Sequence, residues 1–186
     1  MSSARSPIAV AALRASFAAA VLALAAPAGA VRDARDVPLI DQRGTPFTLR
    51  ALHRPTAVVF IDTACDDACA IAEAVFARLA RTTLRAHVDA RLVTITLDPA
   101  HEPPLVMARA AQAFRADPAR WRWASGKPAD VEDLMQAFGV VRVSKTMHST
   151  FAYVLDARGL PARVVPLSTS AEHELLAALR AAAQHG

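Results

Sequence analysis

The sequence contains few cysteines, few lysines and few glycines. It has two cysteines, two lysines and six glycines in 186 residues. Two cysteines are too few for a scaffold held together by disulfides, and a chain of this length can bury an adequate core without them. The scarcity of lysine and the absence of a basic run argue against a nucleic-acid-binding face. We therefore expect no nucleic-acid partner, and the cysteine pair requires another explanation.

Long hydrophobic runs are also missing, except at the N-terminus. Arg5 and Arg14 precede the run FAAAVLALAA, and the small residues APAGA follow it. The uncharged stretch 15–31 is shorter than the roughly 20 apolar residues that span a bilayer. This pattern predicts a secretory signal peptide over residues 1–30, cleaved after Ala30, with retention as an inner-membrane anchor as the alternative. We expect an exported, periplasmic protein whose only membrane contact is through an uncleaved N-terminus.

The part of the chain after the predicted signal is nearly neutral. Residues 31–186 contain 19 basic and 17 acidic side chains, a net charge of +2. Their number suits one domain. We predict a short charged linker over residues 31–37 and a single domain over residues 38–186.

From residue 37 onward, the sequence alternates between runs typical of strands and runs typical of helices. TAVVFID, residues 56–62, predicts a strand buried on both faces. Further strands are expected at 90–98 and 120–125, with hairpins over 37–52 and 151–167. Helices are expected over 66–87, 103–114, 128–139 and 170–184, the first with Ile71, Val75, Leu79 and Leu84 near helical spacing and the last with Ser170 as N-cap. This order predicts an α/β, thioredoxin-like fold: a central mixed sheet flanked by helices, with an N-terminal β-hairpin.

The stretch FIDTACDDACAI, residues 60–71, carries both cysteines between a predicted strand and a predicted helix. Sheets of this class place their chemistry at the carboxyl ends of the strands. On a helix, Cys65 and Cys69 share one face with Cβ atoms about 5–6 Å apart, so both sulfurs can point at one ion. A disulfide needs Cβ atoms about 3.5–4.5 Å apart, a modest distortion. The spacing alone leaves a metal site, a redox couple and a structural disulfide open.

Two aspartates, Asp66 and Asp67, lie between the cysteines. Their carboxylates oppose thiolate formation and favour a bound cation, whereas a reactive nucleophile prefers electropositive neighbours. They also suit the capping position of a helix. The pair has three intervening residues, and the common redox motif has two. These observations favour a metal site slightly over disulfide exchange.

A third metal ligand would come from the histidines. His53, His87, His101, His173 and His185 fall in predicted turns or polar helix surfaces, where we expect solvation. His148 instead lies in an irregular segment directly before the strand FAYVLD, which in a thioredoxin-like sheet faces the first strand-to-helix turn. It is the candidate ligand, because imidazole is the commonest metal-binding side chain. The neighbouring Met147 is expected to have a packing role.

Several motifs together resemble those of one protein family. LIDQRGTPFTL, VVFIDTACDDAC, TLDPA, WRWASG and MHSTFAYVLDARG occur in the order and approximate spacing of the Sco/SenC family, over residues 38–159. Proteins of that family are thioredoxin-like copper chaperones of cytochrome c oxidase assembly. The resemblance implies that Cys65 and Cys69 bind copper as thiolates and His148 as imidazole. Such a set suits Cu(I), and also Cu(II) with a further weak ligand.

The resemblance also implies a function and a partner. The protein is expected to be an exported metallochaperone that delivers copper to an apo-cuproprotein, the binuclear copper site of a cytochrome c oxidase subunit. The chain departs from the family where proline usually follows each cysteine, since Asp66 and Ala70 stand there, although Asp67 matches a common acidic residue. Glu102 stands near the position of a second family aspartate and is expected to have a structural role.

A thiol–disulfide oxidoreductase or redox sensor is the alternative function. It would use Cys65 and Cys69 alone, with a thiol reductase as partner, and would tolerate loss of His148. Under this alternative alone the protein would be an enzyme. A peroxidase is disfavoured because the arrangement of proline and Thr-x-x-Cys in peroxiredoxins is missing. A purely structural disulfide is disfavoured because the pair lies where sites form.

Overall fold

A computed structural model describes residues 33–65, 68–141 and 151–184. The predictions for Asp66, Asp67, Met147, His148 and His185, and for the signal peptide, therefore concern residues outside the described ranges. None of the described helices is long and apolar enough to cross a membrane.

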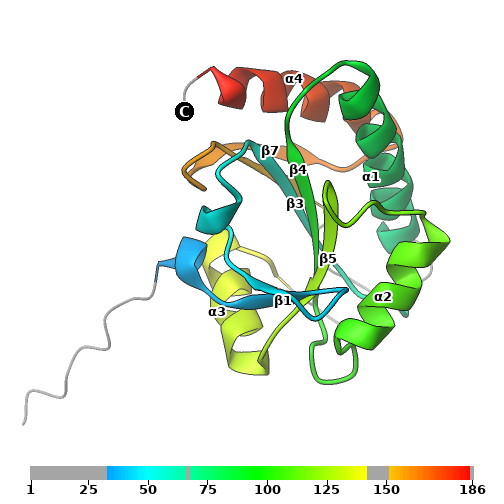
Figure 1. Ribbon diagram of the computed structural model, residues 1–186, viewed down its shortest axis with the longest axis vertical. Helices are drawn as coiled ribbons and strands as arrows, with labels where there is room; N and C mark the ends of the chain where they lie inside the picture. Colours follow the sequence, from blue (N-terminus) through cyan, green and yellow to red (C-terminus); the bar gives the residue numbers. More distant parts are fainter. Residues whose placement is uncertain (1–32, 66–67, 142–150, 185–186) are drawn as a thin grey trace, which may run out of the picture. The chain divides into compact units, whose positions relative to one another are not determined.

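The described strands form one mixed sheet of seven strands in the order β2-β1-β5-β4-β3-β6-β7 (Figure 1). The strands are β1 (Leu39–Asp41), β2 (Pro46–Phe47), β3 (Thr56–Ile61), β4 (Arg91–Thr96), β5 (Trp121–Ser125), β6 (Phe151–Leu155) and β7 (Pro161–Pro166). The central strands β3, β4 and β5 are parallel, while β1 and β6 run antiparallel to their central neighbours. The carboxyl ends of β3, β4 and β5 therefore lie at one edge of the sheet, where β6 begins.

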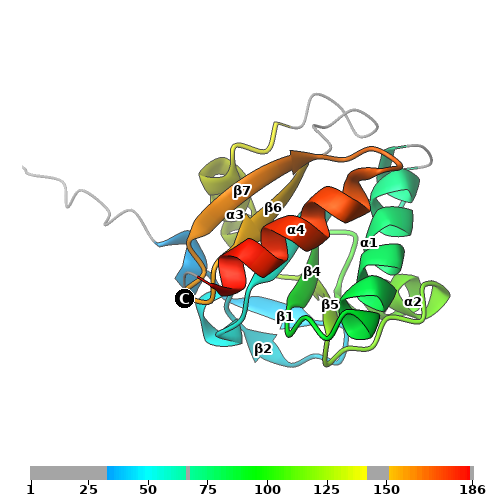
Figure 2. The ribbon, with the colours of Figure 1, turned by 90° about the horizontal axis from the view of Figure 1, so that it is seen from above.

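Helices cover both faces of this sheet (Figures 1 and 2). They are α1 (Ala68–Arg85), α2 (Pro104–Ala113), α3 (Pro128–Phe138) and α4 (Ala171–Ala183), with short 3-10 turns η1 (Ala34–Asp36) and η2 (Arg50–Leu52). One core lies beneath α1, α2 and α4, and the other beneath α3. Val59 of β3 belongs to the first core and Val58 to the second, because successive side chains of a strand point to opposite faces. The predicted mixed sheet flanked by helices is confirmed.

The same local sequence pattern, Asp-x-Arg-Gly, forms the turn between the antiparallel strands β1 and β2 and the turn between β6 and β7. Asp41 accepts hydrogen bonds from the backbone N–H groups two and four residues later, at 2.9 Å each. Asp156 does the same at 2.8 and 2.9 Å. Gly44 and Gly159 follow with φ of 77° and 78°, a left-handed conformation that glycine adopts without steric cost. These turns connect β1 to β2 and β6 to β7, and the β6–β7 pair has a register shift between Val154 and Leu155, beside its turn.

The helix ends agree only partly with the sequence signals. Gly139 ends α3 in the left-handed conformation, and its N–H donates to the carbonyls of Gln136 and Met135. Ser170 precedes α4, but its side chain makes no capping hydrogen bond. Its hydroxyl lies 3.1 Å from that of Ser168 instead. Ser170 is therefore the N-cap of α4 by position, as predicted, but its side chain does not cap the helix, because a neighbouring hydroxyl is its partner.

Candidate functional site

The cysteine pair follows β3, at the edge where the parallel strands end. The backbone N–H of Cys65 donates to the carbonyl of Asp62 at 3.1 Å, and Asp62 Oδ1 accepts the N–H of Ala64 at 2.8 Å. These two hydrogen bonds form a tight turn directly after the strand. Cys69 then lies in the first turn of α1. The predicted placement of the pair at a strand-to-helix turn is what the structure shows.

The two sulfurs have different surroundings. Within the described residues, Cys65 and Cys69 are thiols and form no disulfide. Cys69 is only 1% exposed and belongs to the core beneath α1, whereas Cys65 is half-buried and packs against the edge of that core. Solvent and partner proteins therefore reach Cys65 more readily than Cys69.

The Cys69 sulfur accepts a hydrogen bond from the backbone N–H of Asp62 at 3.4 Å. Burial raises the pKa of the Cys69 thiol, the Asp62 N–H opposes that rise, and Cys65 and Glu73 add to it. The net effect on the pKa is upward, so Cys69 is protonated at neutral pH in the metal-free protein. A protonated, buried thiol is a poor nucleophile.

Glu102 joins the turn after β3 to the end of β4. Its side chain is buried at 4% exposure. Glu102 Oε1 accepts the backbone N–H of Thr63 at 2.6 Å and also the Thr63 hydroxyl, while Oε2 accepts the Thr96 hydroxyl. Glu102 thus holds the backbone just before Cys65. Sequence reasoning expected a structural role for Glu102, but its partners are far apart along the chain and carried no local signal.

A second carboxyl group, that of Glu73, lies one helical turn after Cys69. Partial burial and the nearby charge of Glu102 raise the pKa of Glu73 to about 7. Sequence reasoning missed this residue, because a glutamate on an amphipathic helix ordinarily faces solvent. The site therefore contains a carboxyl that changes its protonation near neutral pH.

An open cavity of about 420 Å³ adjoins the turn that leads to Cys65. Three acidic residues are among its lining, which is formed by Asp62, Thr63, Ala64, Asp98, His101, Glu102 and Val106. His101 Nδ1 is 2.9 Å from Asp98 Oδ2 and the imidazole is exposed. The cavity offers a negatively charged approach to the cysteine turn.

The described residues contain two members of the predicted ligand set. Cys65 ends the turn after β3, Cys69 lies in the first turn of α1 and the two thiols interact, while His148 is outside the described residues. Among the residues that the structure describes, no three His, Cys, Asp or Glu side chains are grouped so that they could hold a metal ion. The described histidines expected to be solvated are indeed exposed, namely His53, His87, His101 and His173.

A comparison with protein-family models decides the family. The model described as SCO1/SenC matches residues 28–184. The chain belongs to the SCO1/SenC family. A search among curated proteins found no match.

Solved Sco structures share the fold of this chain at low sequence identity. ScoI of Bradyrhizobium japonicum, solved with copper bound, has 22% identity and a TM-score of 0.66 over 78% of this chain and 96% of that one. A SCO1/SenC family lipoprotein of Bacillus anthracis has 20% identity and a TM-score of 0.70, over 78% and 92%. BsSco, a Sco protein in which a disulfide switch was identified, has 16% identity and a TM-score of 0.71, over 80% and 92%. The predicted thioredoxin-like fold is confirmed.

Proposed function

We propose that this Sco protein is an exported metallochaperone that binds one copper ion through Cys65, Cys69 and His148. It passes the ion to an apo-cuproprotein, the binuclear copper site of cytochrome c oxidase. The observation that carries the proposal is the pair of neighbouring thiols where β3 leads into α1, the half-buried Cys65 in the turn and the buried Cys69 in the helix. The relatives support the cargo and the destination, since ScoI of Bradyrhizobium japonicum was solved with copper and BsSco is described as a member of a family of cytochrome c oxidase assembly proteins.

The unlike burial of the two sulfurs suits a site that holds copper and also releases it. Thiolates are soft ligands that select Cu(I). Cys69 would be the inner ligand, with its sulfur oriented by the Asp62 N–H at 3.4 Å. The half-buried Cys65 would be the ligand that an incoming thiolate of the partner replaces first. Copper transfer then proceeds by ligand exchange without a change in oxidation state.

Chain connectivity supports His148 as the third ligand. His148 precedes Phe151, the first residue of β6, by three residues. Each residue spans at most about 3.6 Å, so its Cα lies within about 11 Å of that of Phe151. Ala152 pairs with Val59, two residues before the end of β3. An imidazole tethered at this edge can reach the cysteine turn.

The acidic surroundings also favour a cation. Glu73 and Glu102 lie near each other and near the cysteine turn, and Asp62 and Asp98 line the adjoining cavity. Metal binding requires both thiols to lose their protons, so a bound cation must offset the raised pKa of Cys69. Copper affinity should therefore increase with pH, as each ligand proton released adds to the pH dependence.

The N-terminal segment supports export. The apolar run before Ala30 follows two arginines and no acidic residue, and a solved relative is described as a lipoprotein. We assign residues 1–30 as a signal that is cleaved after Ala30. The mass of the protein recovered from the periplasm tests this assignment, since an intact N-terminus would indicate an anchor.

Anaerobic titration of the reduced protein with Cu(I) against a competing chelator tests the copper site. We expect one tightly bound copper per chain, with affinity lost in Cys65→Ser and Cys69→Ser and lowered at least tenfold in His148→Ala. The matched control is His173→Ala, which removes an exposed histidine of α4. Unchanged affinity in His148→Ala would remove that residue from the site, and unchanged affinity in either cysteine variant would refute the site.

A thiol–disulfide oxidoreductase is the second candidate, favoured by the adjacency of the two thiols and by the disulfide switch identified in BsSco. In that reaction the two thiols lose two protons and two electrons to a substrate disulfide, which becomes two thiols. Incubation with a dithiol–disulfide redox buffer, followed by mass spectrometry, measures the exchange. Rapid cycling in both the parent protein and His148→Ala, together with no competitive copper binding by the parent protein, would favour this candidate over the chaperone.

A further inference from the structure

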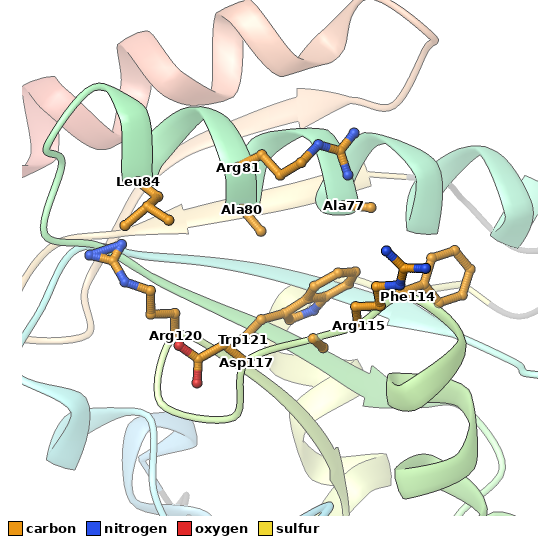
Figure 3. A pocket seen from close by; sticks show the side chains of 10 residues that line it. Ala77, Ala80, Arg81, Leu84, Phe114, Arg115, Asp117, Arg120 and Trp121 are labelled. Carbon is orange, nitrogen blue, oxygen red and sulfur yellow. The ribbon is translucent and has the colours of Figure 1, made fainter.

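A cavity of about 270 Å³ lies between α1 and the segment that joins α2 to β5 (Figure 3). Neither cysteine is among its lining residues. It faces the second half of α1, at the other end of the helix from Cys69. Its chemistry is therefore separate from that of the proposed copper site.

The wall of this cavity is apolar and well supported. Ala80 and Leu84 of α1 face Phe114 and Trp121 across it (Figure 3). The Trp121 ring is fixed because its indole N–H donates to the Thr94 hydroxyl at 2.9 Å, and the side chain is only 1% exposed. The ring centroid of Phe114 lies 6.1 Å from that of Trp121. The two rings are tilted by 51° to each other, so this wall is apolar and angular, with Ala80 and Leu84 opposite the rings.

Three arginines, Arg81, Arg115 and Arg120, also line the cavity. None of them forms an ion pair or a side-chain hydrogen bond within the described part of the chain. Ion pairs are formed by most other described arginines, namely Arg35, Arg43, Arg50, Arg54, Arg78, Arg91, Arg158 and Arg163. The cavity thus gathers three guanidinium groups that have no ion-pair partner in the described part of the chain, beside one carboxylate, that of Asp117.

Among the three arginines, Arg120 is the most buried. Its Nη1 atom is buried and has no hydrogen-bond partner among the described residues. A buried donor without a partner costs about 1–3 kcal/mol, and a charged one costs more. Asp117, the one acidic residue of the lining, uses Oδ1 to accept the backbone N–H of Ala119 at 2.9 Å. Nη1 itself has no surface open to the cavity, so an anion bound there would pair with the Arg120 cation through the other guanidinium nitrogens.

The backbone conformation of Arg115 is a second indication of a binding site. It lies two residues after α2 with φ of 51°, the left-handed region that glycine ordinarily occupies at the end of a helix. A non-glycine residue in this conformation costs about 1 kcal/mol or more, and such strain is often found at binding sites. In Figure 3 the Arg115 guanidinium lies beside Phe114, and that of Arg120 lies near Leu84 at the other end of the cavity.

We propose that this cavity binds a small organic anion composed of an aromatic or short aliphatic body and one carboxylate or similar charged group. The body would lie against the apolar wall between the two ends of the cavity, and the charged group would pair with the guanidinium at one end, that of Arg115 or that of Arg120. Arginine suits this task because its planar fork binds a carboxylate through two hydrogen bonds and also stacks on rings. The volume suits a compound of one or two rings. The protein therefore has a ligand site in addition to its copper site.

NMR titration with 2-naphthoate tests the proposal, with the neutral 2-naphthamide as matched ligand. The indole N–H signals of Trp121 and Trp123 report binding, because Trp121 lines the cavity. We expect saturable shifts of the Trp121 signal at one 2-naphthoate per chain and binding of 2-naphthamide at least tenfold weaker. Equal binding of the two compounds, or no saturable shift, would overturn the proposal.

Variants separate the cavity from general charge effects. Arg115→Gln with Arg120→Gln should weaken 2-naphthoate about tenfold or more and leave 2-naphthamide unchanged. The matched control, Arg109→Gln with Arg180→Gln, removes two exposed arginines outside the lining and should change neither. An equal loss in the control would overturn the proposal. Two further variants repeat the test should the double variant fail to fold. Arg81→Gln removes an exposed guanidinium of α1, and Ala80→Leu places a larger side chain in the cavity.

Discussion

Glu102 accepts the backbone N–H of Thr63 at 2.6 Å, and this contact connects the turn that carries Cys65 to the end of β4. The same carboxylate accepts the hydroxyl of Thr96. Glu102 therefore links two parallel strands at the edge where their carboxyl ends meet. The position of the half-buried Cys65 depends on a residue 37 positions away in the chain.

Replacement of Glu102 should destabilise the fold and loosen the cysteine turn. Glu102→Ala leaves the Thr63 N–H without its acceptor, and we expect a loss of about 3 kcal/mol in the free energy of unfolding. Glu102→Gln keeps one acceptor and should lose about 1 kcal/mol. Urea denaturation measures both values. The control is Glu132→Ala on the exposed face of α3, and a loss in Glu102→Ala no larger than in this control would contradict the role of Glu102.

The raised pKa of Glu73 predicts a stability that decreases as the pH rises. Because the folded protein holds the proton up to a pKa of about 7, above the usual 4.5, it binds more protons than the unfolded chain between these values. The contribution of Glu73 is fully present below pH 4.5 and is lost as the pH rises through 7. Glu73→Gln should flatten this dependence and gain about 1–2 kcal/mol at pH 8, after allowance for solvent screening.

Thermal unfolding of the parent protein and Glu73→Gln at pH 5 and pH 8 measures the difference. The two proteins should be similar at pH 5 and diverge at pH 8. If the difference in thermal stability between the two proteins were the same at pH 5 and pH 8, Glu73 would ionise in the folded protein as it does in the unfolded chain. Glu132→Gln, which changes an exposed glutamate of α3, is the control.

The two cysteines should react with iodoacetamide at different rates. Cys69 is 1% exposed and its pKa is raised, mainly by burial, while Cys65 is half-buried. Because alkylation requires an accessible thiolate, we expect Cys65 to react at least tenfold faster at pH 8. Mass spectrometry of timed samples locates the label. Equal rates in the folded protein would contradict this difference, and equal rates are expected after denaturation.

Substitution of either Asp41 or Gly44, the first and last residues of the Asp-x-Arg-Gly turn after β1, should destabilise the fold. Burial by itself would raise the pKa of Asp41, but the N–H groups of Thr45 and Arg43 and the Arg43 guanidinium lower it overall. Its stabilisation is therefore present above the usual pKa of 3.8 and is lost as the pH falls through the lowered value. Asp41→Ala should cost about 2 kcal/mol at pH 7, because two backbone N–H groups lose their acceptor.

Gly44→Ala in the same turn should cost about 1 kcal/mol, from the positive φ alone. No atom lies within 4 Å of the added methyl group, so steric contact does not contribute. Urea denaturation of Asp41→Ala and Gly44→Ala at pH 7 measures both costs. Asp133→Ala, at an exposed position of α3, is the control for the aspartate. Losses within 0.5 kcal/mol of the parent in both turn variants would contradict this account.

Local patterns predicted the elements well, and tertiary contacts decided the details. The run at residues 56–62 forms the fully buried β3, and Pro104 stands at the first position of α2, as expected from their sequences. Ile71 and Leu84, at near-helical spacing with buried Val75 and Leu79, are 40% and 56% exposed. Helical periodicity identifies a face, but neighbouring elements determine how much of that face is covered.

By itself, the sequence determined the family, the order of strands and helices, and the position of Cys65 and Cys69 after a central strand. These properties depend on residues close together in the chain. Only the tertiary structure decided that Cys69 is buried while Cys65 is accessible, that Glu102 holds the turn between them and β3, and that unpaired arginines surround one cavity. Burial, pKa values and cavity lining depend on groups that folding brings together from distant positions, and local sequence patterns do not encode these distances.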